Sequence, residues 1–166
     1  MRDKDDLLDE VVDTLLGEVW RPRAREDAWR TWIAEAADEL RGFLVSQPAA
    51  LHVYLGHPVV SVSALARMEA MMRVLREAGL NESAARRAYG AIHTYTIGFA
   101  ALEASRAREA RAEHDADDLA RQLAAYTTPQ QFAKGLDYLL EGVSLSAGVD
   151  PDRGLRPAAG TMEPSR

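Results

Sequence analysis

The sequence predicts an all-α fold, and three of its features support that prediction. Apolar residues recur at steps of three and four along most of the chain, as they do on the buried face of a helix. No stretch alternates polar and apolar residues in the manner of a half-buried strand. Thr128, Pro129 and Gln131 form a capping box, in which threonine caps a helix, proline takes its first position and glutamine follows three residues after the cap.

Length, charge and composition limit the class of protein. A chain of 166 residues provides one core of useful size, so we expect one domain over residues 1–147 and a disordered tail over 148–166. The formal net charge of −6 argues against nucleic-acid binding by this chain itself, because contacts to phosphates need clustered positive charge. The sequence has no cysteine, no run of ~20 apolar residues and no signal-peptide pattern, so we expect a cytoplasmic protein without a membrane partner.

Two helices are expected in the N-terminal part of the chain. Asp3 caps the first, whose apolar stripe runs from Leu7 to Val19 with acidic residues on the outer face. Pro22 interrupts the pattern, and the second helix extends from about Asp27 to Ser46, where Pro48 stops it. Its buried side is expected to hold Trp29, Trp32, Ile33, Ala36, Leu40, Phe43 and Leu44.

The next segment is short and apolar, and a methionine-rich helix follows it. A turn or short helix occupies 49–56, and Gly56 and Pro58 prevent it from continuing. The fourth helix, about Ser63 to Ala78, ends at Gly79 with a left-handed cap. It carries three methionines, Met68, Met71 and Met72.

The central helix, from Asn81 to about Arg108, has two different apolar sides. Bulky residues on one side suit the protein interior or a pocket. These residues are Tyr89, Ile92, Tyr95, Phe99 and Leu102. Small residues on another side suit close packing of a second helix, within the chain or across a dimer. These residues are Ala91, Thr94, Gly98, Ala101 and Ser105.

A charged loop at 111–118 and two further helices complete the chain. The first of them is short, is capped by Asp115 and ends near Tyr126. The last begins at Pro129, and its apolar face holds Phe132, Leu136, Leu139, Leu140 and Val143. Glycine inside a helix costs roughly 0.5–1 kcal/mol relative to alanine, so Gly135 and Gly142 indicate close approach of another backbone.

The chemistry-bearing residues favour binding over catalysis. No phosphate-binding loop, dinucleotide-binding motif, metalloprotease motif or nucleophile elbow occurs, so we expect neither an enzyme nor a cofactor. The histidines, His52, His57, His93 and His114, include no pair four residues apart, so no metal site is expected. His93 is either structural or a ligand contact. The methionines and aromatic residues either fill the core or line a deformable cavity.

Four segments together resemble the C-terminal ligand-binding and dimerisation domain of the tetracycline-repressor (TetR) family of regulators. Residues 3–8, Asp-Lys-Asp-Asp-Leu-Leu, resemble the segment that follows the family's recognition helix. Residues 54–58, Tyr-Leu-Gly-His-Pro, resemble the bend after its sixth helix. Residues 92–99 and 132–142 are similar to its eighth and last helices.

The resemblance implies which residues meet the ligand and the partner. The family's last two helices form an intermolecular four-helix bundle, which implies a homodimer. The corresponding interface positions are Ala91, Gly98, Ala101, Phe132, Leu136, Leu139, Leu140 and Val143. The ligand-binding positions are Trp20, Leu40, Tyr54, His57, Met71, Tyr89, His93 and Thr94, and Met68 joins them from the methionine-rich helix. A metal-coordinating histidine of the tetracycline-binding members matches Tyr54, so a magnesium–tetracycline complex is not expected.

The sequence therefore predicts the effector-binding and homodimerising domain of a TetR-like transcriptional repressor. The family's helix-turn-helix is expected upstream of Arg2, and operator DNA would be bound only through that module. The effector is expected to be an apolar or aromatic small molecule that changes the tilt of the Leu7–Val19 helix and so releases DNA. The alternative is a stand-alone helical dimerisation module with a filled core and no ligand.

Overall fold

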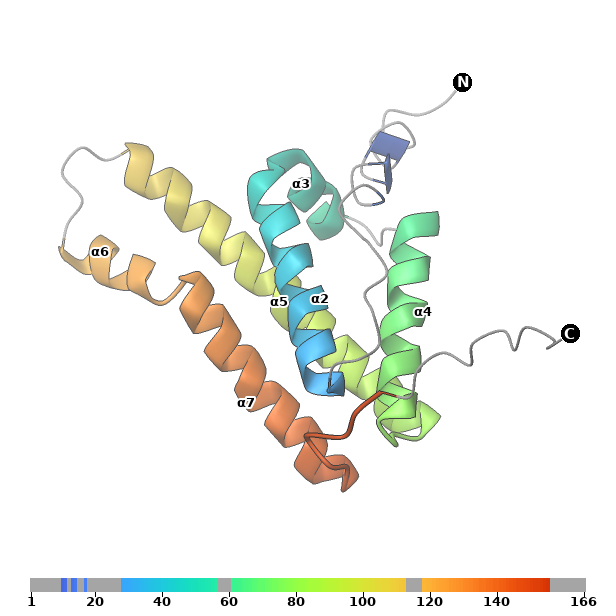
Figure 1. Cartoon of the computed structure of the whole chain (residues 1–166). Helices are drawn as coiled ribbons and strands as arrows, with labels where there is room; N and C mark the ends of the chain where they lie inside the picture. Colours follow the sequence, from blue (N-terminus) through green and yellow to red (C-terminus); the bar gives the residue numbers. More distant parts are fainter. Residues whose placement is uncertain are drawn as a thin grey trace, which may run out of the picture.

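The computed structural model describes residues 28–56, 61–112 and 118–155, together with Glu10, Val11, Asp13, Thr14 and Gly17. Its helices are α2 (Trp29–Ser46), α3 (Pro48–Gly56), α4 (Val62–Glu77), α5 (Glu82–Ala112), α6 (Asp118–Ala125) and α7 (Pro129–Ala147) (Figure 1). Within the described residues the only other regular feature is an isolated bridge between Ala28 and Gly154. The all-α prediction is confirmed. Most of the expected Leu7–Val19 helix, and the expected cap Asp115, lie outside the described residues.

Helix α5 is the element around which the others pack, since it contacts α2, α3, α4, α6 and α7. Asn81 fixes its start as predicted, because the Asn81 Oδ1 accepts a hydrogen bond from the Ala84 amide at 2.9 Å. The buried row of α5 consists mainly of small residues, which allows α2 to lie close against it. This row holds Ala85, Ala88, Ile92, Thr96, Ala100 and Ala104.

The prediction of one bulky and one small apolar side on α5 is only partly correct. Ile92, from the bulky set, is fully buried, but Leu102 of the same set is 52% exposed. The small residues Ala91, Thr94 and Gly98 are exposed on the described chain, so they do not form the helix contacts inside it. The interior contacts come instead from a row of alanines at helical spacing.

Two clusters of buried residues form the core. The larger joins α2, α4, α5 and α7 through Trp29, Ile33, Met71, Leu75 and other apolar residues. The smaller joins α2, α3 and α5, and it includes Leu40. Pro48 opens α3 directly after Gln47, so the predicted stop of the second helix is also the first position of the next. No helix in the described part of the chain is both long and apolar enough to cross a membrane.

Helix α7 begins as the sequence predicts. The Thr128 hydroxyl accepts a hydrogen bond from the Gln131 amide at 3.2 Å, and Pro129 takes the first turn. Gly135 is a close-approach position, because a Cβ there would collide with the Tyr95 hydroxyl of α5. Gly142 differs from this expectation, since a Cβ at Gly142 would meet nothing within 4 Å in this chain.

Three of the residues expected at a dimer interface are core residues of the single chain. Phe132, Leu136 and Leu140 of α7 are at most 2% exposed, because they pack on α2 and α5. A second copy therefore cannot reach their side chains in this conformation. The exposed side of α7 carries Tyr138 and Leu145 instead, which are 65% and 75% exposed.

The segment after α7 is packed, where the sequence led us to expect a disordered tail from 148 onward. Gly148 ends α7 with a φ of 63°, a left-handed conformation that glycine adopts readily. The chain then returns to the start of α2, where the Trp29 Nε1 donates to the Asp150 carbonyl at 3.0 Å. Leu155 is 7% exposed and joins the larger core cluster. Residues 156–166 lie outside the described part.

Candidate functional site

A cavity of about 130 Å³ lies between α3, α4 and α5. Tyr54 of α3 forms one wall, and a row from α5 forms another. Helix α4 supplies the rest, including an arginine. The lining residues are Tyr54, Ala64, Leu65, Arg67, Met68, Tyr89, His93 and Ile97.

Helical spacing explains why these side chains meet. Tyr89, His93 and Ile97 are four residues apart, so they form one row along α5. Ala64 and Met68 are likewise four residues apart on α4. Ser61 fixes the start of α4, since its hydroxyl accepts a hydrogen bond from the Ala64 amide at 3.2 Å.

His93 lies between two phenol rings. Its ring stacks on Tyr89, with centroids 5.3 Å apart and planes inclined by 18°. The Tyr54 ring is 6.4 Å away and tilted by 51°. The Nδ1 of His93 is buried and has no hydrogen-bond partner among the described residues. An unpartnered buried nitrogen is costly, so this atom is suited to contact a ligand.

Arg67 is the one cavity residue whose charge is buried, and sequence reasoning missed it. Its side chain is 4% exposed, and its Nη2 donates to the Ala36 carbonyl of α2 at 3.0 Å. The signal was present in the sequence, because Arg67 precedes the buried Met71 by four residues and Leu75 by eight. Arginine is rarely buried unless it is paired, so a charged residue on the apolar stripe of a helix is a candidate for a functional site.

Burial and Arg67 set the ionisation states in the cavity. Burial, with a smaller contribution from the Arg67 charge, lowers the pKa of His93 to about 4, so the imidazole is neutral at pH 7. Burial raises the pKa of Tyr54 to about 12 although Arg67 acts in the opposite direction, and burial also raises the pKa of Tyr89. Burial lowers the pKa of Arg67 as well, but a guanidinium stays protonated at neutral pH.

The structure brings together four of the nine predicted ligand-binding residues: Tyr54, Met68, Tyr89 and His93 line the cavity. Leu40 and Met71 are buried in the two core clusters and are not among the lining residues. Leu40 nevertheless supports the cavity, because Tyr54 packs against its cluster. Thr94 is exposed on another side of α5. Trp20 and His57 lie outside the described residues.

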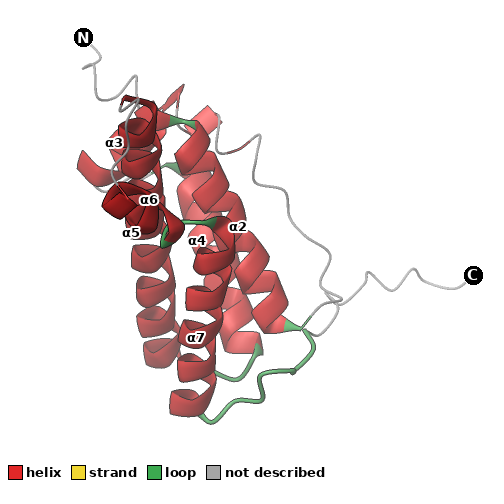
Figure 2. Cartoon of the chain, turned by 90° about the vertical axis from the view of Figure 1, so that its left-hand side faces the viewer, coloured by secondary structure: helices red, strands yellow, loops and turns green. Residues whose placement is uncertain are grey.

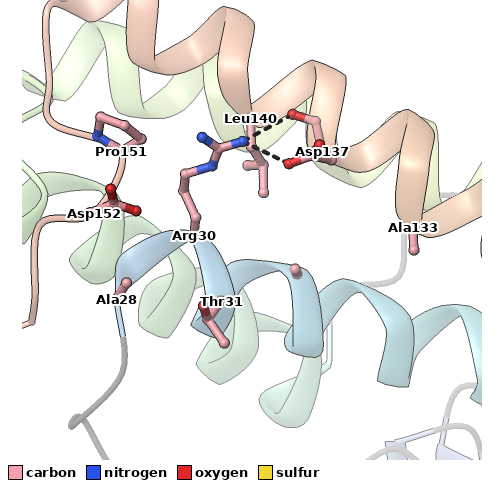
Figure 3. Close-up of a pocket in the computed structure, with 9 residues that line it drawn as sticks. Ala28, Arg30, Thr31, Ala133, Asp137, Leu140, Pro151 and Asp152 are labelled. Carbon is pink, nitrogen blue, oxygen red and sulfur yellow. Dashed lines mark hydrogen bonds and ion pairs between the residues drawn. The ribbon is translucent and has the colours of Figure 1, made fainter.

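A wider groove between α2 and α7, of about 360 Å³, is already crossed by ion pairs (Figure 3). Arg30 extends from α2 to α7, where it pairs with Asp137 at 2.8 Å and with Glu141 at 2.7 Å. Pro151 and Asp152, from the segment after α7, line one end of the groove. Because its central cation is neutralised by two carboxylates, this groove is a weaker candidate for ligand binding than the cavity.

A third hollow, of about 240 Å³, lies between the first turns of α5 and the last turns of α7. Its lining is apolar apart from Arg87 and Ser146. Among the residues that the structure describes, no three histidine, aspartate or glutamate side chains gather in the manner of a metal site.

Comparisons with known proteins agree on a family. Residues 21–146 match the tetracyclin repressor-like C-terminal domain. An HTH-type transcriptional regulator of Saccharopolyspora erythraea is 32% identical over 162 residues, which cover 89% of this chain and 69% of that protein.

Solved structures share the fold. The TetR family protein ActR of Streptomyces coelicolor, in complex with actinorhodin, superposes with a TM-score of 0.67 at 21% identity, over 88% of this chain and 78% of that one. A possible TetR family regulator from the same species superposes with a TM-score of 0.69 at 24% identity, over 86% and 78% of the two chains. The chain belongs to the TetR family of transcriptional regulators, of which it carries the C-terminal domain.

Proposed function

We propose that this domain binds an apolar or aromatic effector in the cavity between α3, α4 and α5 and transmits that binding to DNA release. The observation that carries the proposal is the meeting of Tyr54, Tyr89 and His93 around a cavity that contains a buried, unpartnered nitrogen. Small-molecule sites combine apolar walls with a few polar groups in this way. ActR, which shares the fold, has been solved with actinorhodin and with (S)-DNPA, and this agrees with ligand binding by such a fold.

A contact between the N-terminal segment and α4 supports the proposed transmission. The Asp13 Oδ1 accepts a hydrogen bond from the Ser63 amide at 2.8 Å, in the first turn of α4. A Cβ at Gly17 would lie 3.1 Å from the Ser63 hydroxyl, so this second position is also close to α4. The same helix supplies Arg67 and Met68 to the cavity. An effector that binds more tightly to one position of α4 would therefore shift the N-terminal segment, and with it an attached DNA-binding module.

We also propose that the domain forms a homodimer through the exposed side of α5 and α7. We define this α5–α7 face by Ala91, Gly98, Leu102, Tyr138, Gly142 and Leu145, all of which are exposed. The two helices lie side by side on the face turned toward the viewer in Figure 2. Large exposed apolar side chains gathered on one face of a domain are typical of an interface. Ala91 and Gly98 belong to the predicted interface, whereas Phe132, Leu136 and Leu140 support it from within the chain.

A pair of substitutions tests the location of the ligand site. Ala64→Phe would place a ring inside the cavity, whereas Ala133→Phe would place one in the α2–α7 groove. The ligand would first be found by thermal unfolding against apolar and aromatic compounds, since binding at a hundredfold excess over Kd stabilises by about 2.7 kcal/mol. We expect Ala64→Phe to abolish that stabilisation and Ala133→Phe to retain it. The reverse pattern would move the site to the groove, and the absence of any stabilising compound would favour a module without a ligand.

A further inference from the structure

The cavity carries a fixed positive charge in addition to its aromatic walls. Arg67 lies in its lining with a side chain that is 4% exposed. Solvent screens a charge at this depth far less than it screens a surface charge. Glu39 of α2 is one carboxylate that acts on Arg67, and it lies outside the lining of the cavity.

The charge of Arg67 reaches every titratable group that faces the cavity. It disfavours protonation of His93, and it favours ionisation of both Tyr54 and Tyr89. Asp13 opposes this effect only at Tyr54, where it is the smallest contribution. The Arg67 charge therefore favours an anionic group in the cavity, whereas burial acts against it at both tyrosines.

His93 adds a second polar contact on the α5 side. Its neutral imidazole has one nitrogen that donates and one that accepts, and Nδ1 is buried without a partner. A hydroxyl group both donates and accepts, so it can satisfy this nitrogen in either tautomer. The ring of His93 is held by its stack on Tyr89, which fixes the direction of Nδ1.

The volume of the cavity limits the size of the ligand. About 130 Å³ is close to the roughly 150 Å³ of an engineered apolar cavity that takes up benzene. This volume matches one six-membered ring between Tyr54, Tyr89 and Ile97, and the cavity is partly open, which leaves room for small substituents on the ring. A ring is also the shape that the two tyrosines and the imidazole favour, because aromatic rings pack well against one another.

We propose that the effector is a single-ring aromatic acid, whose acidic oxygens bind Arg67 and whose hydroxyl group binds His93 Nδ1. This inference rests on the proposed function of the cavity as the effector site. It narrows the expected ligand from any apolar or aromatic molecule to a hydroxylated aromatic anion.

Calorimetry on the whole chain at pH 7 tests the acid requirement without any substitution. The probes are benzoate, the three hydroxybenzoates and the three matching hydroxybenzamides, which have nearly the same shape without the charge. We expect at least one hydroxybenzoate to bind at least tenfold more tightly than its amide, since hydrogen bonds to charged groups are the stronger kind. We also expect it to bind about tenfold more tightly than benzoate, as one added hydrogen bond allows.

Two variants assign these effects to residues. Arg67→Gln should lower the affinity for the acid to that for the amide and leave the affinity for the amide unchanged. Arg76→Gln is the matched control, because Arg76 is an exposed arginine on the same helix and does not line the cavity. His93→Phe keeps a ring against Tyr89, so it should lower the affinity for hydroxybenzoate to that for benzoate and leave benzoate binding intact. A circular dichroism spectrum that matches the wild-type spectrum would show that each variant is folded.

The outcomes separate this inference from the proposed function. If a hydroxybenzamide binds as tightly as its acid, the acid requirement is overturned while the cavity remains an effector site. If only larger aromatic compounds bind, and Ala64→Phe removes them, the single-ring limit is overturned. If no aromatic compound of either charge binds, this inference is wrong, and if no apolar compound binds either, the proposed effector site is wrong as well. Tighter binding of the acid, lost in Arg67→Gln and kept in Arg76→Gln, supports the inference.

Discussion

Gly135 shows how a single missing side chain allows α5 and α7 to meet. The Tyr95 ring of α5 lies over Phe132 of α7, with centroids 5.3 Å apart and planes inclined by 16°. The Tyr95 hydroxyl donates to the Phe132 carbonyl at 3.0 Å, and it occupies the space that a Cβ at position 135 would need. The glycine is therefore required by packing within the chain.

Gly135→Ala should lower the free energy of unfolding, because the new methyl group displaces the Tyr95 hydroxyl and breaks its hydrogen bond. Overpacking of this kind costs about 1–3 kcal/mol. Gly90→Ala is the matched control, since a Cβ at Gly90 of α5 meets nothing within 4 Å. That change should raise stability by about 0.5–1 kcal/mol, the difference in helix propensity. Urea unfolding measures both, and equal effects would contradict the packing role of Gly135.

His93 should make stability depend on pH in a defined window. Burial and the charge of Arg67 lower its folded pKa to about 4, against an ordinary value of 6.5. Between these values the unfolded chain binds a proton that the folded chain does not, so stability falls as the pH falls from 6.5 to 4. Above 6.5 neither state is protonated, and His93 has no effect.

Urea unfolding at several pH values measures this dependence, and His93→Phe is its reference. We expect the variant to lose less stability than the wild type over the same window, since its ring cannot be protonated. The carboxylates of the chain contribute equally to both proteins. Identical slopes would show that the pKa of His93 is the same in the folded and the unfolded chain, which would contradict the effect of burial on this imidazole.

At the scale of elements, the sequence predicted the helices well because their signals are local. The caps Asn81 and Thr128 act within three residues, and the glycines Gly79 and Gly148 have the left-handed φ that a helix end requires. The order of the helices also supported the family resemblance. That order can be recognised from the sequence, because the apolar period of each helix does not depend on what the helix packs against.

The site was harder to predict, because a cavity depends on how helices are rotated against one another. The family resemblance named Tyr89 and His93 as ligand-binding positions but could not show that Arg67 of α4 faces them. The resemblance also named Thr94, but Thr94 follows His93 directly, and adjacent residues on a helix point about 100° apart. The packed segment at 149–155 was missed for a similar reason, since its Asp150 carbonyl and Leu155 are stabilised by distant partners on α2 and in the core.

The contact between Asp13 and α4 is a test of coupling between elements. Burial raises the pKa of Asp13, but hydrogen bonds from Ser61 and Ser63 outweigh burial and leave the pKa below its usual value. The stabilisation is therefore present at neutral pH and is lost as the pH falls through the lowered pKa. Asp13→Ala should expose the Ser63 amide to faster hydrogen exchange and lower stability by at most about 1 kcal/mol.

Asp13→Asn separates the charge from the hydrogen bond in this experiment. Its side-chain oxygen can still accept from Ser63, so we expect exchange at the Ser63 amide to lie between those of the wild type and Asp13→Ala. Exchange at Leu80, whose amide bonds to Leu75 at the other end of α4, serves as an internal reference. Unchanged exchange at Ser63 in both variants would remove the structural basis for coupling the N-terminal segment to the cavity.

At the scale of the whole molecule, the cavity and the α5–α7 face use different sides of the same helix. Tyr89, His93 and Ile97 of α5 point into the cavity, whereas Ala91, Gly98 and Leu102 are the exposed α5 residues of the α5–α7 face. The alanine row between them packs on the core of the single chain. The proposed ligand site and the proposed dimer interface can therefore be changed separately by substitution.

Leu145→Glu should give a folded monomer. Leu145 is 75% exposed on α7, so the change disturbs no contact within the core, but it would place a carboxylate in the proposed apolar interface. Leu55→Glu is the control, because Leu55 is 59% exposed on α3, which has no contact with α7. Light scattering should report a monomer for Leu145→Glu and a dimer for the wild type and Leu55→Glu.

The monomer should still bind the effector, since every described residue of the cavity comes from one chain. A dimeric Leu145→Glu would place the interface elsewhere, and a monomer that no longer binds would mean that the second copy completes the site.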